Sequence, residues 1–216
     1  FILDLRNNPG GLLDQSVKIA SHFLQRGNLV VFTKGRKPND RDEYRALYED
    51  TLKSVPLAIL INHQSASASE IVAGALKDSG QALIVGESSY GKGSVQTIFK
   101  IGENEGIRLT TSKYYTPSGI DITKQGILPG VQILDDISFE SINELMDKKQ
   151  LRKEKTSIKL KRSTVEKFLK KSGLAVTRNN DPTLLFSHMI VKQSLRTNKK
   201  KLAMETAREL VVNFRY

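Results

Sequence analysis

Short apolar runs of strand length alternate with segments of helical periodicity, and this alternation constrains the fold of the chain most. The clearest unit is an apolar run over 56–61, a helical segment over 65–78 and a second apolar run over 82–85. Residues 1–5 and 12–24 form a similar strand and helix earlier in the chain. A strand, a helix and a second strand normally form a parallel pair through a crossover. The sequence therefore predicts a layered α/β core.

Later parts of the chain have a different character. Strand patterns occupy 94–100 and 107–115, and helices are predicted over 139–146, 164–171, 181–195 and 202–212. Residues 151–216 carry 17 Lys and Arg against 5 Asp and Glu, a net charge of +12, whereas the first 150 residues carry 17 against 18. The asymmetry marks a boundary in composition near residue 150. We interpret the basic residues as the solvated faces of packing helices rather than as a site for nucleic acid or a membrane.

Composition excludes several kinds of site. The chain has 216 residues and no cysteine, which rules out disulfides, thiolate nucleophiles and Cys-ligated zinc. No apolar run reaches the roughly 18 residues that a membrane span needs. The first five residues already have the pattern of a core strand, so we expect that residues upstream have been omitted. The lack of a signal segment therefore says nothing about localisation.

A segment rich in small residues, Asn-His-Gln-Ser-Ala-Ser-Ala-Ser-Glu over 62–70, joins a predicted buried strand to a predicted helix. Small side chains allow a sharp turn there, and backbone N–H groups at the start of a helix favour a developing oxyanion. One of the three alternating serines could therefore be a nucleophile. Serine is also a common helix cap without any catalytic role, and the segment alone leaves that alternative open.

A lysine stands between two glycines directly after the next buried strand, in Gly-Lys-Gly over 91–93. The glycines allow a tight backbone path that would bring Lys92 inward, where desolvation favours the neutral amine. Only a neutral lysine can accept the proton of a serine hydroxyl. Gln96 could hold that amine by a hydrogen bond without charging it. The alternative is a solvated loop lysine.

Two other kinds of site compete for the same part of the sequence. Residues 86–92 match the phosphate-binding loop Gly-x4-Gly-Lys, but Gly93 lacks the hydroxyl that follows in that motif, and a strand-like segment follows where a helix is required. Catalysis by His63 would need an acid to orient the imidazole, and the sequence shows no obvious partner. We therefore favour the lysine.

Four motifs occur in one order: Asp-Leu-Arg-Asn-Asn-Pro-Gly-Gly (4–11), Ser-Ala-Ser-Ala-Ser-Glu (65–70), Gly-Lys-Gly-Ser-Val-Gln (91–96) and Tyr-Tyr-Thr-Pro-Ser-Gly (114–119). Together they resemble the carboxyl-terminal processing proteases, or tail-specific proteases. The resemblance covers roughly residues 1–135. It implies a core of βα units related to the crotonase and Clp-protease fold, with 136–216 as a basic helical region.

The resemblance also implies roles for individual residues. Ser67 would be the nucleophile, Lys92 the general base and Gln96 the residue that orients it. The backbone N–H of Ala68 and that of Gly10 or Gly11 would form the oxyanion hole, and the choice of glycine stays open. Asp78 matches an acidic position that supports activity in some members, although it could equally be a surface carboxylate at a helix end.

The family's chemistry predicts a serine endopeptidase that needs neither metal nor organic cofactor. Expected substrates are proteins with exposed apolar C-termini. Further expectations are a periplasmic or otherwise exported location, self-association through the C-terminal helices, and an adaptor protein. Gly130 replaces an acidic residue that often follows the proline of 126–129. The resemblance also leads us to expect a PDZ domain, which these 216 residues do not include. The rival functions are an inactive protease-fold scaffold and a hydratase-like enzyme.

Overall fold

The computed structural model describes residues 1–37, 39–49, 52, 55–134, 158–172 and 181–196. It has the predicted mixed α/β character, with two sheets. The first sheet is parallel throughout, in the order β1 (Ile2–Asp4), β4 (Leu57–Ile61), β5 (Ala82–Gly86), β8 (Val131–Leu134) and β9 (Ile158–Lys161). The second is antiparallel, in the order β3 (Arg41–Arg45), β2 (Leu29–Gly35), β7 (Gly106–Tyr115) and β6 (Ser94–Lys100).

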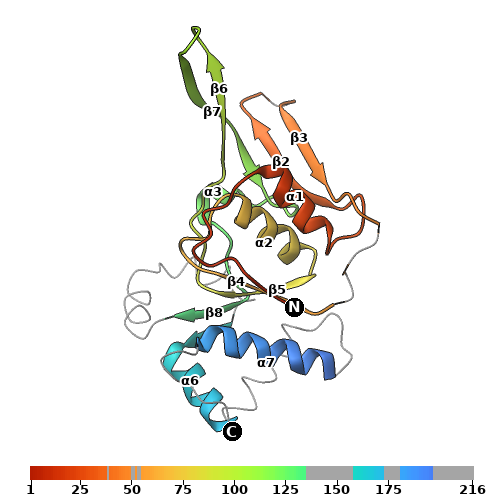
Figure 1. Ribbon diagram of the computed structural model, residues 1–216, viewed down its shortest axis with the longest axis vertical. Coiled ribbons are helices and arrows are strands. Elements are labelled where there is room, and N and C mark those ends of the chain that lie inside the picture. Colours follow the sequence, from red (N-terminus) through yellow and green to blue (C-terminus); the bar gives the residue numbers. More distant parts are fainter. Residues whose placement is uncertain (38, 50–51, 53–54, 135–157, 173–180, 197–216) are drawn as a thin grey trace.

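Helices cover both faces of the parallel sheet (Figure 1). Helices α1 (Leu13–Ser21) and α2 (Ala68–Asp78) lie between the two sheets, and α6 (Arg162–Lys171) and α7 (Pro182–Arg196) lie on the opposite face. All five residues of β4 are buried, because a strand with helices on both faces has no side open to water. The alternate side chains of this strand enter two separate apolar clusters, with Ile59 in one and Leu60 in the other.

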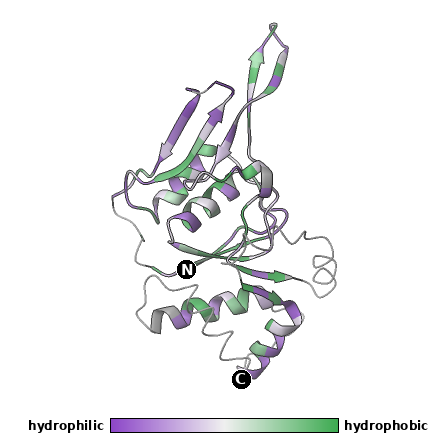
Figure 2. Ribbon diagram, turned by 180° about the vertical axis from the view of Figure 1, so that it is seen from behind, coloured by the Kyte–Doolittle hydropathy of each residue, from purple (hydrophilic) through white to green (hydrophobic). Residues whose placement is uncertain are grey.

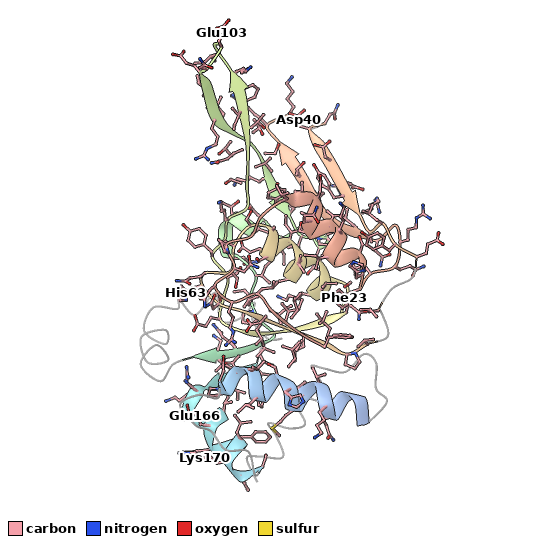
Figure 3. The ribbon with its side chains drawn as sticks, viewed as in Figure 1. Phe23, Asp40, His63, Glu103, Glu166 and Lys170 are labelled. Atoms are coloured by element: carbon pink, nitrogen blue, oxygen red, sulfur yellow. The ribbon has the colours of Figure 1, made fainter. Side chains whose placement is uncertain are left out.

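The hairpin of β6 and β7 extends away from the rest of the molecule (Figure 1). Strand β2 pairs with β7 only between Phe32–Tyr115 and Gly35–Ser112, so the outer part of the hairpin is a two-stranded ribbon. Glu103 lies at its tip (Figure 3). Apolar side chains on this ribbon are exposed, and Figure 2 colours parts of it as hydrophobic.

The strands and helices predicted within residues 1–115 are all present, with small shifts of their ends. The structure has one additional strand in this range, β3, which lies in a polar stretch that gave no strand signal. The helix expected from residue 65 begins at Ala68, because Ser67 has a positive φ. The sequence also gave no signal for β8, β9 and the short helix α3 (Ile122–Gln125).

Two of the four predicted C-terminal helices are found as α6 and α7, while those over 139–146 and 202–212 lie outside the described residues. Strand β9 pairs with β8, and α7 packs on β1, β4 and β5. The described part of the basic region thus contributes directly to the central sheet. The division into 1–135 and 136–216 stays a prediction. No helix among the described residues is long and apolar enough to cross a membrane.

Candidate active site

Three loops that carry the predicted site residues leave neighbouring strands at the same edge of the parallel sheet. Strands β1, β4 and β5 are adjacent and parallel, so their carboxyl ends meet. The loop with Gly10 follows β1, the turn with Ser67 follows β4, and the loop with Lys92 follows β5. The carboxyl edge of parallel strands is where open α/β sheets place their ligands.

The structure separates the roles of the three alternating serines. The Ser65 hydroxyl donates to the Leu5 carbonyl at 2.7 Å, and the Ser69 hydroxyl donates to the Asn8 carbonyl at 3.1 Å. Both side chains are buried and hold the turn against the loop after β1. Ser67 alone is partly exposed, so its hydroxyl is the one that can meet a substrate.

The backbone at Ser67 adopts a sparsely populated conformation, with φ 56° and ψ −116°. Such a conformation costs a non-glycine residue about 1–3 kcal/mol and persists only where its surroundings enforce it. Ser67 stands between a buried strand and a helix, which is the arrangement of a nucleophile elbow. The predicted position of Ser67 at the start of the helix is therefore accompanied by a sharp turn.

Gly10 lies directly against this turn, whereas the side-chain position of Gly11 is open. A Cβ placed on Gly10 would stand 2.5 Å from the Ala66 oxygen and 2.7 Å from the Ala68 nitrogen, and φ at Gly10 is +97°. A Cβ on Gly11 would meet nothing within 4 Å. The N–H of Gly10 donates to Asn8 Oδ1 at 2.9 Å, whereas those of Ala68 and Gly11 donate to no acceptor in the described chain.

The backbone of the lysine loop is held at several consecutive residues. Tyr90 N–H donates to the Ser65 carbonyl at 3.0 Å, which joins this loop to the serine turn. The N–H groups of Gly91 and Lys92 both donate to the Glu70 carboxylate. Gly93 fits close against α3, since a Cβ there would lie 2.6 Å from the Thr123 nitrogen. The path of the chain past Lys92 is therefore fixed.

The side chain of Lys92, by contrast, is exposed, which corrects the prediction that the glycines bring it inward. The loop turns Lys92 toward solvent because its main chain, not its side chain, faces the buried Glu70. Lys92 Nζ forms no hydrogen bond to Ser67 Oγ or to Gln96 in the described chain. Gln96 is also exposed and follows a bulge between Val95 and Gln96, and bulges near sites redirect side chains.

Asp78 lies at the other end of α2 from Ser67. Eleven residues of helix separate its two ends by about 15 Å, so Asp78 does not touch the nucleophile. Its Oδ2 accepts the backbone N–H of Ser118 at 2.8 Å. Its neighbour Lys77 donates to the Leu128 carbonyl at 2.8 Å, and desolvation lowers the pKa of that amine. This end of α2 thus anchors the segment that follows β7.

His63 has an acidic partner after all, which corrects the sequence-based statement that none was obvious. Its Nδ1 lies 3.1 Å from Glu87 Oε2 at the ends of β4 and β5. Figure 3 labels His63 at this edge of the sheet. The imidazole is 71% exposed and hydrogen-bonds no serine hydroxyl in the described chain. A surface pair of this kind gives no base for Ser67.

The phosphate-loop alternative fails on geometry. Strand β6 follows Gly93 where a helix would be needed. The loop N–H groups of Gly91 and Lys92 that could face an anion are occupied by the protein's own Glu70. Among the described residues there is no group of three His, Asp or Glu side chains that could hold a metal.

Sequence reasoning overlooked Glu70 as a functional candidate, although it is fully buried and bonds to both loops. The available signal was its position three residues after Ser67, because Glu at that position of a helix commonly reaches back to the N-cap. Asn8 and Asn62, which link the first loop to the serine turn, carried no such signal.

The loop after β1 is also tied to α7. Arg6 pairs with Asp4 at 2.6 Å and with Asp181, the residue before α7. The hydrogen bond from Arg6 lowers the pKa of Asp4, and the two carboxylates together raise the pKa of Arg6. The first motif therefore connects the site edge to the C-terminal helices.

The first 133 residues of the chain are similar to known proteins. The sequence pattern that defines peptidase family S41 matches residues 1–133. The chain is 53% identical over 133 residues to a carboxy-terminal-processing protease of Bartonella bacilliformis, an alignment that covers 62% of this chain and 30% of that protein. It is 42% identical over 133 residues to the chloroplastic C-terminal processing peptidase of Tetradesmus obliquus, covering 62% and 28%.

Among solved structures, the photosystem II D1 C-terminal processing protease is similar, with a TM-score of 0.56 and 41% identity. That alignment covers 61% of this chain and 33% of the other. The chain therefore spans about a third or less of the length of the relatives it matches.

Proposed function

Because the chain belongs to peptidase family S41, we propose that it forms the catalytic core of a serine endopeptidase that processes the C-terminal tails of proteins. The observation that carries the proposal is the contrast among the three serines. The Ser65 and Ser69 hydroxyls donate to backbone carbonyls, whereas Ser67 is partly exposed on a strained turn at the carboxyl edge of the sheet. That is the placement that a nucleophile requires.

Lys92 is the proposed base. The Lys92 N–H donates to Glu70, and the nearby Tyr90 N–H donates to the Ser65 carbonyl of the serine turn. The Cα of Lys92 therefore has a fixed position beside the nucleophile turn. Its amine is held by no carboxylate in the described chain, and four flexible methylenes let it turn toward Ser67. A substrate that covers the site would exclude water from around the amine, and only the neutral form of a lysine amine accepts a serine proton. Gln96 is the proposed partner that orients it.

In the proposed reaction, Lys92 takes the Ser67 proton as the hydroxyl oxygen attacks a peptide carbonyl. The oxyanion accepts hydrogen bonds from backbone N–H groups. Ala68 supplies one, because its N–H has no other acceptor in the described chain. We assign the second to Gly11, since the Gly10 N–H is bonded to Asn8. The proton passes to the leaving amine, and water then resolves the acyl-enzyme.

The proposed substrates are proteins with exposed C-termini, in keeping with the names of the relatives. That these termini are apolar is proposed from the family resemblance alone. Export to the periplasm, self-association through the C-terminal helices, an adaptor protein and a fold relationship to the crotonases are further proposals by family resemblance.

The proposal is tested on the full-length protein with a serine-directed fluorophosphonate probe and a peptide with an apolar C-terminus. Wild type should be labelled and should cleave, and Ser67→Ala should do neither. Lys92→Arg should lower cleavage by a factor on the order of 10³ or more, because guanidinium stays protonated. Ser65→Ala, which removes a buried hydroxyl two residues away, should still be labelled.

Labelling that persists in Ser67→Ala, or full activity in Lys92→Arg, would refute the assignment. An inactive scaffold would bind the tail peptide without cleaving it. Turnover of an acyl-CoA by the wild type would instead favour the hydratase-like alternative.

A further inference from the structure

We propose that Glu70 is the positioning residue that holds the nucleophile turn and the lysine loop in one geometry. This inference rests on the proposed function, because it concerns the same Ser67 and Lys92. Glu70 lies in the first turn of α2 and its side chain is fully buried. It does not reach the hydroxyl or the amine; it acts on the backbone at both.

Four donors surround the Glu70 carboxylate. Oε2 accepts the backbone N–H of Ser67 at 2.8 Å and that of Lys92 at 2.8 Å. One oxygen thus joins the main chain of the proposed nucleophile to the main chain of the proposed base. Oε1 accepts the Gly91 N–H at 2.7 Å and the Ser89 hydroxyl at 2.5 Å.

The number of donors explains why the group is a carboxylate. Each oxygen accepts two hydrogen bonds, which fills the acceptor capacity of the ion and satisfies its burial. An amide in the same place would turn an NH2 group toward two donors, whichever way it was oriented. The filled carboxylate has no further acceptor position for the Lys92 amine, so its contact with Lys92 is through the main chain.

The arrangement extends one step further through Ser89. While its hydroxyl donates to Glu70, its oxygen accepts the Ile127 N–H at 2.7 Å, and its own N–H donates to the Ile127 carbonyl at 3.2 Å. The segment after α3 therefore supports the Glu70 carboxylate indirectly, through the Ser89 hydroxyl. Loss of the Ser89 hydroxyl would remove one of four donors and the link to Ile127, and so loosen the carboxylate that holds both loops.

The experiment compares Glu70→Gln with Val72→Ala in the full-length protein. Val72 is buried on the same helix within the apolar cluster. Its truncation should therefore destabilise the fold, as Glu70→Gln also should, but it removes no hydrogen bond to either loop. Glu70→Gln should remain folded and lose about 100-fold in kcat while KM changes by less than about threefold, because misplacement by about 1 Å costs that much. Labelling of Ser67 by the fluorophosphonate should slow in parallel. Val72→Ala should keep its kcat.

Unchanged kcat in Glu70→Gln, with Ser67→Ala inactive, would overturn this inference and leave the proposed function intact. Activity in Ser67→Ala would instead overturn the proposed function. A matching fall of kcat in Val72→Ala would mean that general stability, not positioning, is responsible. Should Glu70→Gln fail to fold, Ser89→Ala decides: a several-fold loss of kcat supports the inference, and a wild-type kcat refutes it.

Discussion

Two adjacent glycines in the first motif differ in whether a side chain would fit at their position. Gly10 has φ +97°, and a Cβ there would press on the Ala66 oxygen and the Ala68 nitrogen. Both atoms belong to the backbone of the nucleophile turn and cannot move aside without displacing Ser67. We therefore expect Gly10→Ala to lower kcat/KM by a factor on the order of 10² or more. Gly11→Ala should stay within about threefold of wild type, because the N–H is retained and no atom lies within 4 Å of the new methyl group.

Peptide cleavage and thermal unfolding of both variants, measured side by side, check this expectation. Equal activity in the two variants would contradict the close contact between Gly10 and the serine turn. Strong loss in Gly11→Ala alone would mean that the second glycine, and not the first, carries the steric constraint.

At the level of single residues, the sequence predicted a serine–lysine chemistry, which stays a prediction, but not the local geometry. The residue pattern alone could not tell Ser67 from Ser65 and Ser69, because the three stand in near-identical local surroundings, and only the family resemblance selected Ser67. The distinction comes from carbonyls of Leu5 and Asn8, some 60 residues earlier in the chain. The exposure of Lys92 was missed for the same reason: a buried carboxylate on α2 takes the loop's N–H groups.

Helix α2 connects the site to the segment after β7, and the Asp78 prediction belongs to this element. Asp78 accepts the Ser118 N–H at the far end of the helix from Ser67. If its role is to hold that turn, Asp78→Asn should cleave within about threefold of wild type, since an amide oxygen still accepts the bond. Asp78→Ala should lower the free energy of unfolding by about 1 kcal/mol, because the bond is lost.

Urea denaturation and steady-state cleavage separate these outcomes. Inactivity of a well-folded Asp78→Asn would show that the charge of Asp78 takes part in the reaction and that the residue does more than hold the Ser118 turn.

Among the elements, those with strong periodicity could be predicted and those dependent on partners could not. The runs of β4 and β5 and the apolar face of α2 follow from residue pattern alone. Strand β3 consists of Arg-Asp-Glu-Tyr-Arg and exists because β2 offers it an edge. Strands β8 and β9 contain four residues each and are defined by their pairing with one another and with β5.

At the scale of the whole molecule, the proposed catalytic loops follow strands of a parallel sheet that is apolar on both faces and is buried by helices on both. The family pattern ends at residue 133, yet the second apolar cluster draws on residues far beyond it. Phe186 of α7 is 1% exposed and packs in the same cluster as Leu60 and Val85. Its ring meets that of Phe168 edge to face, with 5.8 Å between the ring centroids. Among the described residues of this region, Arg162, Lys167, Lys170, Lys171 and Lys192 are exposed, so there the charge pattern reflects a solvated face and not the packing on the sheet.

The structure therefore predicts that α7 is part of the folding unit that carries the site. Phe186→Ala should lower the free energy of unfolding by about 3–5 kcal/mol, because it leaves a cavity beneath β4 and β5. Leu184→Ala, on the same helix but 39% exposed, should change it by no more than about 0.5 kcal/mol. Denaturant unfolding of both variants provides the measurement. Were Phe186→Ala as stable as Leu184→Ala, Phe186 would contribute nothing to the core, and α6 would be the main described cover on that face of the sheet.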